Sequence, residues 1–225
     1  AGKSTLFSII SNVLQPLEGE IFIDCVDIKT LKTDKVAQRL AVLRQLSSIQ
    51  IKLTVEELIT FGRFPHSKGK ITKLDREKIE DAIKYMQLEN KRNKYIDQLS
   101  GGERQRALIA MVLAQDTKYI LLDEPLNNLD IKYAIEMMII LKNLVRDYKK
   151  TIVVIMHDIN MAASYCDQMI ALKKGVVTKI GTPEEMIHEE VLEHIYECPF
   201  KVIDMDGKRF CMYHQNENLN DEKTS

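Results

Sequence analysis

Four consecutive residues near the start of this 225-residue chain, Gly2-Lys3-Ser4-Thr5, match the second half of the phosphate-binding loop G-x-x-x-x-G-K-[ST]. In that loop the lysine reaches the β- and γ-phosphates of a nucleotide, and the hydroxyl that follows it binds Mg²⁺. We therefore expect Gly2, Lys3, Ser4 and Thr5 to hold phosphate, with Ser4 as a Mg²⁺ ligand. Taken alone, the four residues fit a simple Gly-Lys turn at a helix start at least as well.

A second phosphate-type site is formed by Ser100, Gly101 and Gly102, which lie in the run Leu99–Arg106 just before a predicted helix. Glycines let the backbone approach a ligand closely, and the free N–H groups at a helix start favour negative charge. This stretch is therefore expected to bind an anion.

An acidic pair, Asp123 and Glu124, follows the apolar run 119–122. A short buried strand that ends in Asp is the expected partner of a phosphate-binding loop, because its carboxylate supports Mg²⁺. Since neighbouring strand residues point to opposite faces, Glu124 is expected to face an attacking water, where a general base contributes about 10²- to 10⁴-fold to hydrolysis. The apolar run argues against two merely solvated acids.

The charges of the chain nearly cancel, with 32 Lys and Arg against 33 Asp and Glu. Nucleic-acid binding usually needs a basic excess, so the composition disfavours it, although a local basic patch stays open. No apolar run reaches the roughly 20 residues that span a bilayer, and no signal peptide precedes the first motif, so we expect a soluble chain. The four cysteines show no ligand spacing and predict reduced thiols rather than a transition-metal site.

Hydrophobic spacing and capping residues divide the chain into strands and helices. The sequence predicts helices at residues 3–14, from 54, from 75, and at 102–113, 131–148, from 182 and 190–196. It predicts strands at 20–28, 40–43, 119–122 and 151–156, then a hairpin at 167–179 and two short strands about residue 206. Strands that alternate with helices indicate parallel neighbours in a covered sheet, and hence an α/β fold. The polar residues 213–225 are expected to form a disordered tail.

The order of the phosphate-binding and acidic motifs resembles that of the ATP-binding cassette (ABC) ATPases, and Leu99–Arg106 is similar to the signature motif of that family. The resemblance covers nearly the whole chain and implies a P-loop NTPase fold of the ABC ATPase type. It implies one nucleotide-binding domain over residues 1–212, with a parallel-sheet core and a helical subdomain at about 54–115. It also implies an N-terminal truncation, because the first glycine of the phosphate loop, a first strand and the aromatic residue that stacks on adenine would precede Ala1.

Further site residues follow from this resemblance alone. Gln45 matches the glutamine that senses Mg²⁺ and the γ-phosphate, Asp130 matches a loop that crosses a dimer interface, and His157 matches the histidine that contacts the γ-phosphate. The family closes two subunits head-to-tail around two ATP molecules, so residues 100–102 of one subunit would bind the γ-phosphate held by the other. Glu103 stands where glutamine is common, a conservative change that is not expected to disable the motif.

Three segments, 53–65, 127–132 and 156–160, are similar to the ATPases of iron(III)-siderophore importers. That likeness implies a homodimer on the cytoplasmic face of the cell membrane, bound to two permease subunits and served indirectly by an extracytoplasmic substrate-binding protein, with ATP and Mg²⁺ as cofactors. Importers of heme, cobalamin or another metal chelate are close alternatives. A non-transport ABC ATPase that acts on nucleic acid and a non-catalytic remnant stay open as well.

Overall fold

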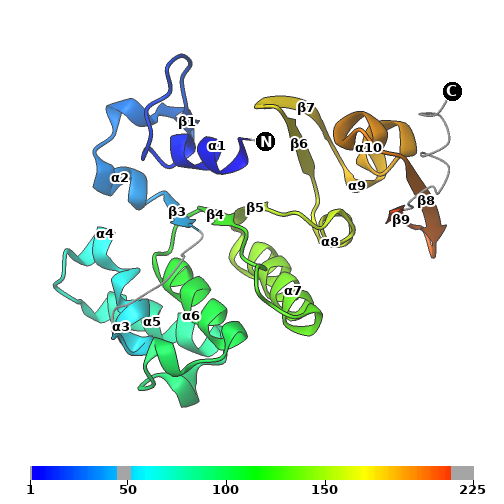
Figure 1. Ribbon diagram of the computed structural model, residues 1–225. Coiled ribbons are helices and arrows are strands. Elements are labelled where there is room, and N and C mark those ends of the chain that lie inside the picture. Colours follow the sequence, from blue (N-terminus) through cyan, green and yellow to red (C-terminus); the bar gives the residue numbers. More distant parts are fainter. Residues whose placement is uncertain (1, 45–51, 214–225) are drawn as a thin grey trace, which may run out of the picture. The chain divides into compact units, whose positions relative to one another are not determined.

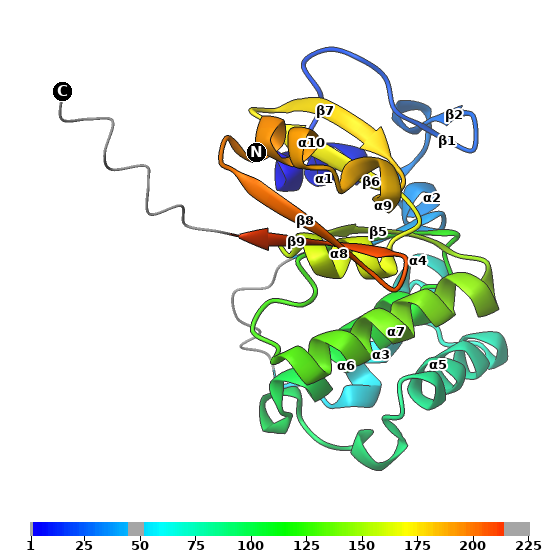
Figure 2. The same ribbon diagram turned by 90° about the vertical axis from the view of Figure 1, so that its right-hand side faces the viewer.

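The computed structural model describes residues 2–44 and 52–213, which fall into two compact units. The larger unit comprises the described residues of 4–156, and the smaller unit comprises residues 157–213 together with Gly2 and Lys3. Figures 1 and 2 together label the helices and strands of each unit. Within the described ranges, no helix is long and apolar enough to cross a membrane.

The larger unit is built on a parallel sheet with the strand order β3-β4-β5. The three strands are β3 (Leu40–Leu43), β4 (Tyr119–Asp123) and β5 (Thr151–Ile155). Residues 120–122 of the central strand are all buried, the least buried of them being 4% exposed. A continuous apolar run of this kind is typical of a parallel strand that is covered on both faces. The expected parallel sheet is confirmed, and Asp123 lies at the carboxyl end of its central strand.

Helix α1 and the segment that follows it pack their apolar side chains against the sheet. These elements are α1 (Lys3–Ile10), β1 (Phe22–Ile23), β2 (Val26–Asp27), the 3-10 helix η1 (Ile28–Thr30) and α2 (Thr33–Ala37). The cluster that they form with the strands consists of Phe7, Ile23, Ile28, Val36, Leu40, Leu121 and Ile155. α1 is shorter than the helix expected at 3–14, because the chain leaves it through Asn12 in the left-handed conformation, with φ of 59°.

The single strand expected at residues 20–28 is wrong, because β1 turns back and pairs antiparallel with β2. The turn residues Asp24 and Cys25 have φ of 50° and 62°, the positive values of a two-residue hairpin turn whose twist matches its strands. The Asp24 carboxylate accepts hydrogen bonds from Lys118 Nζ and from the Tyr119 hydroxyl, the latter at 2.7 Å. These partners lie 94 and 95 positions away, so the local alternation of residues could not reveal the turn.

Between β3 and β4 the chain forms a layer of helices, which lie together in Figures 1 and 2. The layer consists of α3 (Val55–Phe61), α4 (Phe64–Ser67), α5 (Lys73–Tyr85), the 3-10 helices η2 (Glu89–Lys91) and η3 (Ile96–Gln98), and α6 (Gly101–Ala114). Thr54 and Glu57 cap α3 reciprocally, as the sequence predicts. α3 ends against α6 at Gly62, where an added Cβ would lie 2.0 Å from the carbonyl oxygen of Met111. Only glycine allows this close approach.

Helix α7 (Ile131–Tyr148) connects β4 to β5 and has the bounds expected from its apolar spacing. Its buried face consists of Ala134, Met137, Met138, Leu141 and Leu144. After the helix, the buried Lys150 donates from Nζ to the carbonyl oxygen of Thr117 at 2.6 Å and to Asp116 Oδ1 at 3.1 Å. This lysine therefore fixes the chain just before β5 beside the chain just before β4.

The smaller unit consists of short helices and two antiparallel hairpins. Its elements are α8 (Ile159–Tyr165), β6 (Met169–Lys173), β7 (Val176–Gly181), α9 (Pro183–Met186), α10 (Glu189–Tyr196), β8 (Phe200–Met205) and β9 (Lys208–Tyr213). β6 pairs with β7, which confirms the hairpin expected at 167–179, and the two strands expected about residue 206 are β8 and β9, which pair with each other (Figure 2). The core of this unit is the cluster of Ile159, Ile187, Leu192, Phe200 and Cys211.

Candidate functional site

Ser4 and Asp123, which are 119 positions apart in the chain, meet at the carboxyl end of β4. Ser4 lies in the first turn of α1, and its hydroxyl donates to Oδ1 of Asp123 across 3.4 Å. A hydroxyl and a carboxylate are oxygen ligands of the kind that Mg²⁺ takes, together with water and phosphate oxygens. The described part of the chain holds no group of three or more His, Cys, Asp or Glu suited to a metal. This donor set fits Mg²⁺, which is commonly held by one or two protein oxygens and a nucleotide.

Glu124 lies outside the strand, in a backbone conformation that the sequence did not reveal. β4 ends at Asp123, and Glu124 has a φ of 52°, in the left-handed region that costs a non-glycine residue about 1–2 kcal/mol. The Asn127 side-chain amide donates to Glu124 Oε2, and the Asn127 backbone N–H donates to the Glu124 carbonyl at 3.2 Å. The direction of the carboxylate is therefore set by this turn and by Asn127, not by the alternation of a strand.

The N-terminus of α6 is closed by a capping box between Ser100 and Glu103. The Glu103 backbone N–H donates to Ser100 Oγ at 3.3 Å, and the Ser100 backbone N–H donates to Glu103 Oε2 at 3.0 Å. Gly102 is buried, and a Cβ there would lie 3.1 Å from the ring of Tyr133, whereas Gly101 is exposed. Of the three residues expected to bind phosphate, Gly101 is therefore exposed, Gly102 is buried, and Ser100 is hydrogen-bonded to Glu103.

Glu103 has a second partner, because Lys91 Nζ lies 2.8 Å from its Oε1. The hydrogen bond from Lys91 and the one from the Ser100 backbone together lower the pKa of Glu103 to about 2, from the usual 4.5. The unit that carries α6 is therefore stabilised by an ionised Glu103. That contribution is present above about pH 4.5 and is lost as the pH falls toward 2.

We expect Glu103→Gln to lower the free energy of unfolding by about 0.5–1 kcal/mol at pH 7, because glutamine keeps the capping box but loses the charge pairing with Lys91. The difference between wild type and variant should shrink as the pH is lowered from about 4.5 toward 2, because the unfolded and then the folded carboxylate of the wild type gains its proton over that range. Urea unfolding at several pH values measures this. Lys91→Met should remove the larger part of this pH dependence and keep the part that comes from the Ser100 backbone N–H. A difference that stays constant with pH would contradict the pairing.

Asp130 caps α7, since its Oδ1 accepts the backbone N–H of Tyr133 at 3.0 Å. The loop before it runs through Asn128, whose φ is 63°. A Cβ on Gly101 would lie 3.8 Å from the Asn128 carbonyl oxygen, so the structure brings this loop beside the start of α6. The Asp130 carboxylate thus has a structural role in fixing the loop, besides the interface role that the family resemblance implies.

The remaining expected site residues are placed as follows. Lys3 is half-buried and begins α1, Thr5 is exposed on the same helix, and Gly2 has a φ of 87° that favours glycine. His157 is exposed and follows β5 after one residue. Gln45 lies outside the described residues.

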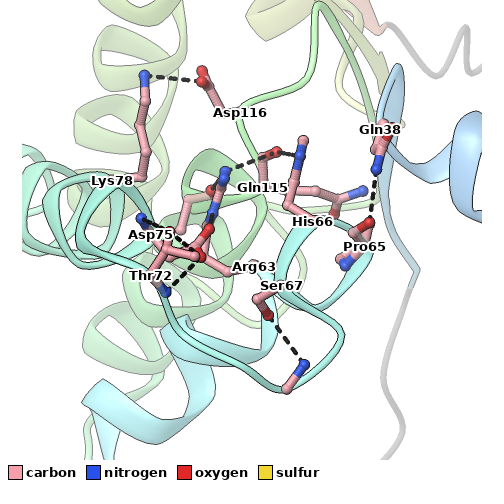
Figure 3. A network of polar contacts seen from close by, with 12 residues as sticks. Gln38, Arg63, Pro65, His66, Ser67, Thr72, Asp75, Lys78, Gln115 and Asp116 are labelled. Atoms are coloured by element: carbon pink, nitrogen blue, oxygen red, sulfur yellow. Dashed lines mark hydrogen bonds and ion pairs between the residues drawn. The ribbon is translucent and has the colours of Figure 1, made fainter.

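A buried network that the sequence did not point to anchors the other end of α6 (Figure 3). Arg63 Nε lies 2.8 Å from Asp75 Oδ1, and Arg63 Nη1 donates to the carbonyl oxygen of Ala114 at 2.8 Å. Gln115 Nε2 donates to the carbonyl oxygen of Ala37 at 2.6 Å. Arg63 therefore ties α6 to the start of α5, and Gln115 ties it to the chain just before β3, so both ends of the helix that begins with residues 100–102 are held.

Comparison with known proteins agrees with the family resemblance. The family model described as "ABC transporter" matches residues 1–127. The petrobactin import ATP-binding protein YclP of Bacillus subtilis strain 168 is 49% identical over 213 residues, which is 95% of this chain and 84% of that protein. The ferric enterobactin transport ATP-binding protein FepC of Escherichia coli strain K12 is 37% identical over 205 residues, or 90% of this chain and 76% of that protein.

Among solved structures, the dimeric post-hydrolysis state of an ATP-binding cassette bound to ADP and Pi is similar to this chain. The TM-score is 0.68 at 32% identity, and the match covers 81% of each chain. The expectation of an ABC ATPase fold is confirmed by this similarity and by the family match.

Proposed function

This chain belongs to the ABC transporter family, whose ATP-binding subunits hydrolyse ATP to drive transport, and we propose that it energises the import of an iron(III)-siderophore. The proposed nucleotide site is supported above all by the hydrogen bond between Ser4 and Asp123 at the end of β4. The cargo is supported by relatives named for petrobactin and for ferric enterobactin, one of them 49% identical. Heme, cobalamin and other chelates remain the alternative cargoes to be tested.

At the nucleotide, Gly2, Lys3 and Thr5 line the phosphate loop, with Lys3 on the β- and γ-phosphates of ATP. Ser4 and Asp123 would hold Mg²⁺, which would supply positive charge to neutralise the phosphates. Lys3 begins α1, so the positive end of the α1 helix dipole favours phosphate charge at this place as well. These residues bind and orient ATP.

Hydrolysis uses the carboxylate of Glu124, which accepts a proton from the attacking water while the Asn127 amide holds it in place. His157 contacts the γ-phosphate, and Gln45 contacts the Mg²⁺ and γ-phosphate end of the site. Both assignments rest on the resemblance of these positions to the family motifs.

Two copies of the chain close head-to-tail, so that residues 100–102 of each copy bind the γ-phosphate held by the other and Asp130 lies at the contact. The exposed Gly101 at the start of α6 and the dimeric cassette among similar structures support this arrangement. The dimer acts as a peripheral assembly on the cytoplasmic face of the membrane, beneath two permease subunits that receive cargo from an extracytoplasmic binding protein. Negative charge between two helix N-termini holds the copies together until hydrolysis removes it.

Uptake of a radiolabelled ferric siderophore tests the proposal. Deleting the gene that encodes this chain should reduce uptake at least about tenfold, because import stops without its ATPase, and the wild-type gene should restore it. Uptake of a labelled amino acid in the same cells is the control and should not change. Normal siderophore uptake with lost heme or cobalamin uptake would reassign the cargo, and ATP-dependent nucleic-acid binding without a copurifying permease would overturn the transport role.

A further inference from the structure

One side chain fastens helix α8 to strand β9 in the smaller unit. Asn160 Nδ2 donates to the carbonyl oxygen of Cys211 at 3.0 Å, and Asn160 Oδ1 accepts the Cys211 backbone N–H at 2.8 Å. The Cys211 thiol also lies 3.2 Å from the same oxygen. A single carboxamide thus satisfies both backbone polar groups of one strand residue, as a neighbouring strand would do.

The contact between Asn160 and Cys211 closes an edge of the hairpin and is shielded from water. β9 pairs only with β8 among the described strands, so its other side is an edge, and Asn160 occupies that edge at Cys211. Cys211 is 3% exposed and belongs to the apolar cluster with Ile159 and Phe200. Burial raises the pKa of the Cys211 thiol. Losing the carboxamide would leave the N–H and C=O of Cys211 without these partners in a largely dry place.

Asn160 lies three residues after His157, and each residue between them is held. Asp158 caps α8, its Oδ1 accepting the backbone N–H of Met161 at 2.9 Å, and Ile159 is 7% exposed in the core cluster. His157 itself is exposed. The backbone that leaves His157 is therefore fixed within one helical turn, and Asn160 joins that turn to a strand 51 positions away.

We propose that Asn160 is a positioning residue for His157, and that the C-terminal hairpin β8–β9 acts through it on hydrolysis. By holding the first turn of α8 against β9, Asn160 fixes where the chain leaves His157, and so where the imidazole can reach. The inference rests on the proposed role of His157 at the γ-phosphate. It gives the C-terminal segment a part in the reaction, in addition to packing.

The test compares three variants of the full-length protein. All are made in a background in which Cys25, Cys166 and Cys198, and any cysteine outside residues 1–225, are replaced by serine, so that Cys211 is the thiol that reacts. Asn160→Ala removes both hydrogen bonds to Cys211, and Asn160→Asp keeps an acceptor for the Cys211 N–H but loses the donor to its carbonyl. Ser164→Ala is the matched control: it removes a hydrogen bond of 2.7 Å to the Asn160 carbonyl, within the same helix and away from β9. The hairpin keeps a separate tie in each variant, since the Val202 N–H donates to Glu189 Oε1 at 3.0 Å.

We expect Asn160→Ala to lower kcat for ATP hydrolysis about 10- to 100-fold, because a small displacement of a group at the reacting phosphate has effects of that size. KM for ATP should stay within about twofold, and an aromatic disulfide reagent should modify Cys211 about tenfold faster. Asn160→Asp should have an intermediate kcat, so the test stands if the alanine variant fails to fold. Ser164→Ala should match wild type in all three measurements.

A kcat within twofold of wild type while Cys211 becomes reactive would overturn the proposal, and so would an unreactive Cys211. An equal loss of kcat in Ser164→Ala would overturn it too, since the effect would then come from a change in helix α8 and not from the contact between Asn160 and Cys211. If the wild-type protein hydrolysed no ATP, the proposed function would fail, whereas the reactivity of Cys211 would still report whether Asn160 holds the hairpin.

Discussion

Replacing Glu124 by glutamine should lower the rate of ATP hydrolysis by about 10²- to 10⁴-fold and leave ATP binding intact. A carboxylate can accept a proton from the attacking water, and a carboxamide cannot, so the loss is that of a general base. Glutamine has the same size and offers an oxygen to the Asn127 amide, so the turn at φ of 52° has no reason to change. Phosphate release in a single turnover measures the rate, and calorimetric titration with Mg-ATP measures binding.

The Glu124→Gln variant should also accumulate as an ATP-bound dimer, because the charge that holds two copies together is no longer removed by hydrolysis. Sedimentation with and without ATP detects this. Glu136→Gln is the matched control, since it makes the same chemical change in α7 at a glutamate that pairs with Arg106, and its turnover should stay within twofold of wild type. Turnover of Glu124→Gln within about threefold of wild type would show that another group activates the water.

The central features of the site could be predicted from local pattern. An apolar run that ends in Asp123 predicts a buried strand, and a Lys-Ser pair before an apolar helix predicts a phosphate loop; the structure joins the two at 3.4 Å between Ser4 and Asp123. Both signals are local. No described strand leads into α1, so the proximity of Ser4 to Asp123 comes from the packing of α1 against the sheet.

Other features depend on contacts between distant segments, which local pattern cannot contain. The turn at Asp24 is held by Lys118 and Tyr119, which lie 94 and 95 positions away in the chain. The contact of Asn160 with Cys211 requires a strand residue that follows 51 positions later. In each case the side chain alone is unremarkable, and only the packing of its partner gives it a role.

The network at Arg63 is the clearest case of this kind, because the residues 62–70 look like a simple helix break in the sequence. Replacing Asp75 by alanine should lower the free energy of unfolding of the larger unit by about 3–5 kcal/mol, since the Arg63 guanidinium would stay buried without its counter-charge. The Arg63 and Asp75 side chains are 4% and 3% exposed. Asp75 Oδ2 also accepts hydrogen bonds from the Thr72 hydroxyl at 2.7 Å and from the Thr72 backbone N–H at 2.9 Å. The substitution therefore also removes one half of the capping box of α5, whereas the bond from the backbone N–H of residue 75 to Thr72 Oγ1 is kept.

The protonation of Asp75 gives the same prediction a pH dependence. Burial raises the pKa of Asp75, but the hydrogen bonds from Thr72 and Arg63 outweigh it and hold the pKa at about 2, below the usual 3.8. Because the folded-state pKa is lowered, the stabilisation is present above about pH 4 and is lost as the pH falls toward 2. The difference in stability between wild type and Asp75→Ala should therefore shrink over that range.

Urea unfolding at pH 7 measures the stability effect, and Asp34→Ala is its control. Asp34 pairs with Lys68 across 3.6 Å at the surface, with side chains 34% and 73% exposed, so its loss should cost less than about 1 kcal/mol. The double variant Arg63→Met with Asp75→Leu removes both charges and should lose much less stability than the two single variants combined. If the double variant loses as much unfolding free energy as the two single variants together, Arg63 and Asp75 are not coupled. In that case Gln115 alone would anchor the C-terminal end of α6.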